Sequence, residues 1–180
     1  ERAYNTYSHL LTSGNSIYVI EAVLLGTLLI HGLIAIHLVA ANKMARPTGY
    51  AQTPQGTKAP SFASQTMHIQ GPIILIFIIL HLAQFKFGTV YTVQYDGVEM
   101  RDIYRLVVET FRQPQFMGLY VFATVALFYH LSHGMESVVQ SLGIRTEVYA
   151  GLVRKLSLIY AIVVGGGFLV QPIYVYFFAR

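Results

Sequence analysis

The chain has 180 residues, of which 54% are hydrophobic and only 11% are charged, and it contains no cysteine. Soluble globular chains carry roughly 25% charged residues, so this chain has too few solvated groups to cover a compact particle in water. The lack of cysteine excludes structural disulfides, thiolate metal sites and iron–sulfur ligation within the chain. The formal net charge is +4, but the basic residues are scattered singly, so we expect no nucleic-acid partner.

Four apolar stretches are each long enough to cross about 30 Å of hydrocarbon at 1.5 Å of helical rise per residue. The second begins near Gly71-Pro72, because the first turn of a helix tolerates proline. The fourth carries Pro172 and the run Gly165–Gly167, which we attribute to close helix packing in lipid. The sequence therefore predicts an all-α polytopic membrane helical bundle, a single domain over residues 1–180, with transmembrane helices at about 17–41, 68–90, 115–140 and 157–179.

The connecting segments are more polar. Residues 1–16 indicate a loop, and residues 42–66, rich in Pro, Gly, Thr and Ala, indicate an aqueous loop. Residues 91–114 carry mixed charges with apolar residues near helical spacing, which predicts a short surface helix. The helical spacing rests on Ile103, Leu106, Val107 and Thr110.

Orientation does not follow from charge, because the twelve Lys and Arg residues divide evenly between the two sides of this topology. Aromatic residues gather near the ends of the predicted spans, as an interfacial belt requires. The tyrosines assigned to this belt are Tyr91, Tyr95, Tyr120, Tyr174 and Tyr176.

Three histidines, His31, His81 and His130, lie inside predicted spans, where an ionisable side chain is costly and indicates function. His31 and His130 each lie ten residues before the same end of their spans, so we expect the two imidazoles at one depth, within roughly 5 Å. Two imidazoles at one depth on different helices are typical of bis-histidine haem, which favours electron transfer. Zinc or iron would need a further histidine or carboxylate there. The alternative is a pair of core histidines hydrogen-bonded across helices without a cofactor.

Other polar or small residues carry weaker expectations. Gly32 and Gly134 would let a flat macrocycle approach the backbone. Glu21 is either an interfacial acid or part of a proton path, and His9 lies in the opening loop. We expect ordinary polar or propionate-contacting roles for His37, His68 and His133.

The sequence is similar to a known family over nearly its whole length. Residues 117–144, MGLYVFATVALFYHLSHGMESVVQSLGI, resemble the fourth helix of the dihaem cytochrome b anchors of succinate:menaquinone oxidoreductases and fumarate reductases, the five-helix type B family. Residues 20–42 resemble the second helix of that family. Residues 70–88 resemble its third, where a glycine also precedes the histidine by ten positions. Residues 3–11, AYNTYSHLL, are similar to the loop before helix two.

The resemblance implies that His31 and His130 ligate the haem b nearer the iron–sulfur subunit, and that His81 is one ligand of a second, distal haem. The family's first helix supplies the other distal ligand and has no match here, so one haem is fully liganded by this chain. We therefore expect a further helix before Glu1. The loops 42–66 and 141–156 are then expected in the cytoplasm, where the flavoprotein and iron–sulfur subunits dock.

These residues predict a haem-bearing anchor in the cell membrane that transfers electrons between those subunits and menaquinone, as part of the respiratory chain and the tricarboxylic acid cycle. The dicarboxylate chemistry, in either direction, would lie outside this chain, which carries no flavin or cluster motif. Alternatives are the cytochrome b subunit of a hydrogenase or formate dehydrogenase, and a transporter or channel with a histidine proton relay. Weak candidates for quinone contact are His9, Glu21 and Gln84.

Overall fold

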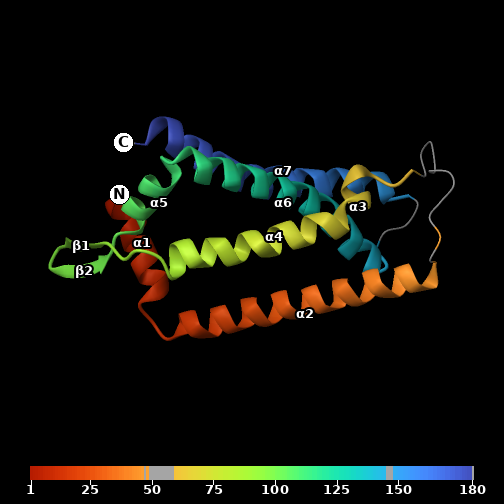
Figure 1. The fold of residues 1–180 in the computed structure, drawn as a ribbon, viewed down its shortest axis with the longest axis horizontal. Coiled ribbons are helices and arrows are strands. Elements are labelled where there is room, and N and C mark those ends of the chain that lie inside the picture. The colour runs from red at the N-terminus through yellow and green to blue at the C-terminus, as the bar shows by residue number, and fades with distance from the viewer. Residues whose placement is uncertain (47, 49–58, 145–147, 180) are drawn as a thin grey trace. The chain divides into compact units, whose positions relative to one another are not determined.

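The computed structural model is mostly helical and divides into two compact units. Unit 1 comprises Glu1–Pro60 and Thr92–Arg101, and unit 2 comprises Ser61–Tyr91 and Asp102–Arg180. The positions of the units relative to each other are not determined (Figure 1), and the predicted single domain over residues 1–180 stays a prediction. The structure describes residues 1–46, 48, 59–144 and 148–179.

Unit 1 contains an antiparallel β-hairpin that we did not predict. Its turn residues, Asp96 and Gly97, both have positive φ, 51° and 80°, as a two-residue type I′ turn requires. The strands have only four residues each, too few for a convincing alternation, so the Asp-Gly pair is the one signal of the hairpin in the sequence. The elements of unit 1 are α1 (Arg2–Thr12), α2 (Ser16–Ala45), β1 (Thr92–Tyr95) and β2 (Val98–Arg101).

The prediction of a loop at residues 1–16 is wrong, because most of this segment forms α1. Ser, Thr and Asn residues lower its intrinsic helix propensity, but α1 packs against β2 and buries Asn5 completely. Arg2 forms an ion pair with Asp96 at the hairpin turn, and the Tyr95 hydroxyl donates a hydrogen bond to Glu1 at 3.1 Å. Tertiary contacts therefore stabilise a helix that propensity alone does not favour.

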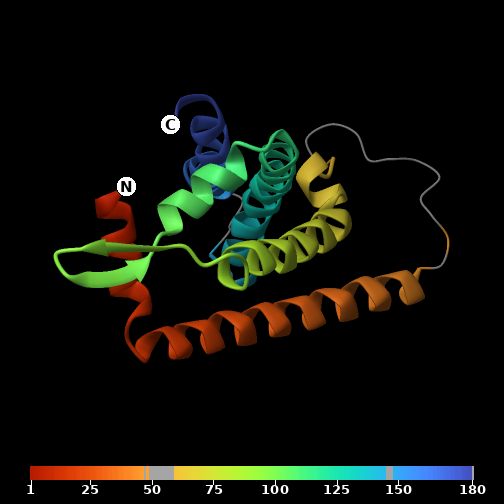
Figure 2. The ribbon, with the colours of Figure 1, turned by 60° about the vertical axis from the view of Figure 1, so that its left-hand side comes forward.

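Unit 2 is a set of packed helices in which α6 and α7 lie side by side (Figures 1 and 2). Helix α4 packs against α6, and α5 packs against both α6 and α7. The elements are α3 (Phe62–Gln65), α4 (Met67–His81), the π-helical turn η2 (Leu82–Lys86), α5 (Ile103–Phe111), α6 (Pro114–Ser141) and α7 (Ala150–Phe178).

The buried face of α7 repeats every four residues and consists mostly of small side chains. Small residues let two membrane helices approach closely, and here they do so at a glycine. A Cβ at Gly165 would lie 3.1 Å from the Cα atom of Phe128 on α6, so the predicted packing role is confirmed for Gly165. The other positions of this face are Val153, Ser157 and Ala161.

Four helices in the described ranges are long and apolar enough to cross a membrane: α2, α4 with η2, α6 and α7. Their bounds agree with the predicted spans to within one residue at most ends. Helix α7 begins seven residues before the predicted 157, because hydropathy places the boundary after Arg154 and Lys155, whereas a helix continues past the apolar region. The loop predicted at 141–156 is therefore partly helical, and its residues 145–147 lie outside the described ones. In the predicted loop 42–66, residues 47 and 49–58 also lie outside the described residues.

The second span differs from its prediction in the place of Pro72 and at its C-terminal end. Helix α4 begins at Met67, so Pro72 lies inside the helix and not in its first turn. The span ends at Lys86 and not near 90, because η2 closes with a hydrogen bond from the Phe87 amide to the Leu82 carbonyl, 2.9 Å. Beyond it the chain turns so tightly that a Cβ at Gly88 would overlap the carbonyl oxygen of Gln84.

The short helix predicted within residues 91–114 is confirmed as α5. Asp102 caps its start, since the Asp102 side chain accepts a hydrogen bond from the Arg105 amide at 3.0 Å. Of the four residues that carried the prediction, Leu106 and Thr110 are buried. Helix α5 is thus fixed to unit 2 by one apolar face.

Candidate functional site

The three intramembrane histidines lie on three different helices. His31 is an exposed residue of α2 in unit 1, His130 is half-buried on α6 of unit 2, and His81 is the last residue of α4. Because the two units are not placed relative to each other, the pairing of His31 with His130 stays a prediction. Counted to the observed helix ends, Ala45 and Ser141, their offsets differ by about three residues, or roughly 4–5 Å of rise.

His81 belongs to a polar cluster that the structure brings together within unit 2. Its Nδ1 atom lies 3.2 Å from the Tyr120 hydroxyl of α6. That hydroxyl donates a hydrogen bond to Oε1 of Gln84 in η2, at 2.9 Å. We call His81, Gln84 and Tyr120 the His81 cluster; it joins the end of one apolar helix to the face of another.

Aromatic rings surround the His81 cluster. The Tyr120 ring meets Phe77 and Phe111 edge-on, with centroids 4.8 Å apart in each pair. Phe85 lies 6.0 Å from the Tyr120 ring and 5.2 Å from the His81 ring. Tyr120 is therefore buried, 6% exposed, and the prediction that it belongs to an interfacial belt is wrong. Sequence position near a span end gives no signal that a tyrosine faces a neighbouring helix.

The hydrogen bonds of the His81 cluster determine which imidazole nitrogen carries the proton. A Gln Oε1 atom only accepts, so the single hydroxyl proton of Tyr120 goes to Gln84. The remaining contact then requires His81 to donate through Nδ1–H, which leaves the lone pair of the neutral ring on Nε2. His81 is itself an exposed residue. The Nε2 lone pair of His81 thus fits the axial ligation of a haem iron. In such histidine ligands the other ring nitrogen is usually hydrogen-bonded, as Nδ1 is here.

The three residues predicted to contact a quinone belong to different units of the structure. His9 lies on α1 and Glu21 on α2, both in unit 1, whereas Gln84 lies in unit 2 within the His81 cluster. Among the remaining histidines, His37 is exposed on α2, His68 lies in the first turn of α4, and His133 is half-buried on α6. Their predicted roles stay predictions.

Two further observations concern cofactor binding. Within the described residues, a Cβ built at Gly32 or Gly134 would have no atom within 4 Å apart from its chain neighbours and the adjoining backbone of its own helix, so both positions are open to approach. In the same part of the chain, no three His, Cys, Asp or Glu side chains form a group that could hold a metal ion.

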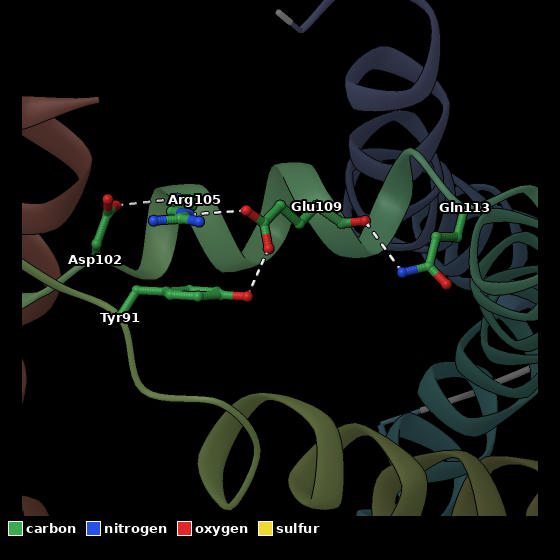
Figure 3. Close-up of polar contacts among 5 residues, drawn as sticks. All are labelled: Tyr91, Asp102, Arg105, Glu109 and Gln113. Carbon is green, nitrogen blue, oxygen red and sulfur yellow. Dashed lines mark hydrogen bonds and ion pairs between the residues drawn. The ribbon is translucent and has the colours of Figure 1, made fainter.

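A second polar cluster lies outside the spans, on α5 (Figure 3). Glu109 accepts hydrogen bonds from the Tyr91 hydroxyl at 2.6 Å and from Nε of Arg105 at 2.7 Å. The Arg105 guanidinium also lies over the Tyr91 ring, 4.2 Å from its centroid. The hydrogen bond from Tyr91, and then that from Arg105, lower the pKa of Glu109, and the bond to Glu109 raises the pKa of Tyr91. Each carboxylate oxygen of Glu109 thus has a partner within the cluster, which indicates a structural role.

Comparison of the chain with protein-family models, with curated proteins and with solved structures finds no match, so the family resemblance of the sequence stays a prediction.

Proposed function

We propose that this chain is the haem b-bearing membrane anchor of a succinate dehydrogenase or fumarate reductase complex, transferring electrons between its iron–sulfur subunit and menaquinone. One observation carries the proposal: three helices able to span a membrane each hold a histidine, and one of these, His81, has its Nδ1 hydrogen-bonded so that Nε2 is left for a ligand. A haem held by two histidines supplies one-electron chemistry without an open position at the iron.

The following residues would bind the haems and contact the other subunits. His31 and His130 would ligate one haem, and His81 would supply one ligand of a second. The apolar helices around them would exclude water, which sets the potential of a buried redox group together with its hydrogen bonds. The loops 42–66 and 141–156 would face the cytoplasm and the flavoprotein and iron–sulfur subunits.

The first test is a dithionite-reduced minus oxidised spectrum of the purified full chain in detergent. We expect a b-type α-band, and its absence would reject the proposal. His31→Ala and His130→Ala should each remove the same haem, whereas His37→Ala, a control on an exposed histidine of the same helix α2, should leave the band unchanged. Retention of the band after both ligand changes would reject the pairing. Pyridine haemochrome stoichiometry distinguishes one haem per chain from two.

The His81 cluster also supports a second candidate, a transporter with a proton relay, because hydrogen-bonded ionisable chains within spans form such relays. The same spectrum separates the two functions. A transporter would lack the α-band, and His81→Ala would abolish proton uptake into proteoliposomes.

A further inference from the structure

Tyr120 is a buried polar residue inside an apolar helix, and the proposed function does not by itself require it. A buried hydroxyl must be hydrogen-bonded, because an unpaired one loses its bonds to water without replacement. The Tyr120 hydroxyl has two partners: it donates a hydrogen bond to Gln84 and accepts one from Nδ1–H of His81. Both partners come from the same short stretch of chain, at the junction of α4 and η2.

The position of the Tyr120 hydroxyl is fixed by packing on three sides. Phe77, Phe85 and Phe111 contact its ring, so the ring cannot swing away without opening a cavity. Phe77 and Phe85 also contact the His81 ring, one helical turn before and after it. The imidazole is thus held by rings along its sides and by the phenol at Nδ1.

The π-helical turn contributes the third member of the cluster. Gln84 lies in η2, where the backbone hydrogen bond skips one residue more than in an α-helix. Gly88 permits the tight turn that follows η2, because any side chain there would overlap the Gln84 carbonyl. The Gln84 side chain therefore comes from a segment whose conformation is itself constrained, and π-turns of this kind frequently mark functional sites.

We propose that Tyr120 is a positioning residue for His81: with Gln84 as its own acceptor, it fixes the His81 imidazole in the Nδ1–H form and orientation that presents Nε2 to a haem iron. This inference rests on the proposed function. The phenol oxygen accepts from Nδ1–H and so makes the imidazole more electron-rich, which favours ferric iron. Removing the acceptor should favour the ferrous form.

The test is a potentiometric titration of the full chain, following the haem that disappears in His81→Ala. Tyr120→Phe keeps the buried ring and removes only the hydroxyl. We expect it to raise the ferrous-to-ferric ratio at a fixed potential by up to about fivefold, the factor for one whole neutral hydrogen bond, or up to roughly 40 mV for one electron, because only the difference in hydrogen-bond strength between the two oxidation states shifts the ratio. Gln84→Leu leaves the phenol less polarised and should shift the ratio in the same direction by less. Tyr160→Phe, at a 41% exposed tyrosine of α7, is the control and should cause no shift.

The outcomes separate this inference from the proposed function. A wild-type chain without haem rejects the proposed function. The same potential and low-spin electron paramagnetic resonance signal in Tyr120→Phe and Tyr160→Phe overturn the role of Tyr120 while the proposed function stands. Haem that is unchanged in His81→Ala overturns the role of Tyr120 and also removes His81 from the haem ligands of the proposed function. Selective loss of the His81-dependent haem in Tyr120→Phe, with far-UV circular dichroism unchanged, supports the positioning role.

Discussion

Replacing Gly165 by alanine should separate α6 from α7. The new Cβ would lie 3.1 Å from both Cα and Cβ of Phe128, where an unstrained carbon–carbon contact is about 3.5–4.0 Å. The Cα of Phe128 belongs to a helix backbone and cannot turn aside, so the two helices must move apart by a few tenths of an ångström. Overpacking of this kind costs roughly 1–3 kcal/mol.

Two neighbouring glycines provide matched controls. Within the described structure, a Cβ at Gly166 or Gly167 would have no atom within 4 Å apart from its chain neighbours and the adjoining backbone of α7. Alanine there therefore brings only the gain in helix propensity, at most about 1 kcal/mol. The same gain applies at Gly165. The difference in unfolding free energy between Gly165→Ala and Gly166→Ala should therefore be the overpacking cost, roughly 1–3 kcal/mol.

The assay is unfolding in mixed micelles with a rising fraction of sodium dodecyl sulfate, followed by far-UV circular dichroism because the chain has no tryptophan. Gly165→Ala should unfold at a lower fraction than the other two variants. Equal midpoints for Gly165→Ala and Gly166→Ala would refute the view that α6 and α7 pack through this glycine. Gly165→Leu should lower the midpoint further.

Two more predictions concern regions outside the helix interface. Folding lowers the pKa of Glu109, so the stability that Glu109 contributes is complete above the ordinary value of 4.5 and is lost as the pH falls through the lowered pKa. Folding raises the pKa of Tyr91, so the stability that Tyr91 contributes is lost only as the pH rises through a pKa above 10.0. Glu109→Gln should thus lower the thermal midpoint at pH 7, and a deficit that persists unchanged in strong acid would contradict this. Gly88→Ala should destabilise the chain by roughly 1–3 kcal/mol, because the new Cβ would overlap the Gln84 carbonyl. The control Gly71→Ala should not destabilise it, because the new Cβ would meet open space within the described residues. Equal dodecyl sulfate midpoints for the two variants would contradict this prediction.

Hydropathy predicts the long helices well, because crossing an apolar layer imposes both length and composition on a segment. It predicts the short elements poorly. Helix α1 and the hairpin form through contacts between residues far apart in sequence, as the ion pair of Arg2 with Asp96 illustrates. Neither partner's local sequence indicates the other.

The candidate site could likewise be predicted only in part from the sequence. The histidines are visible in the sequence, because an imidazole is unusual among apolar residues. Tyr120 is not, since it lies 39 residues from His81 and only the packing of α4 on α6 brings them together. Its hydroxyl also decides the tautomer of His81, which no spacing of histidines could indicate.

The turn at Leu82–Lys86 has a consequence for how this chain tolerates changes in length. A π-helical turn is equivalent to an α-helical turn into which one residue has been inserted. Deleting a single residue there would restore regular helical hydrogen bonds and leave the direction of the segment that follows almost unchanged, because the wider turn uses one residue more for about the same angular sweep. A single deletion within the regular part of α4 would instead rotate everything downstream by roughly 100° about the helix axis. We therefore expect the chain to tolerate a one-residue deletion at Leu82–Lys86 better than one earlier in the same helix.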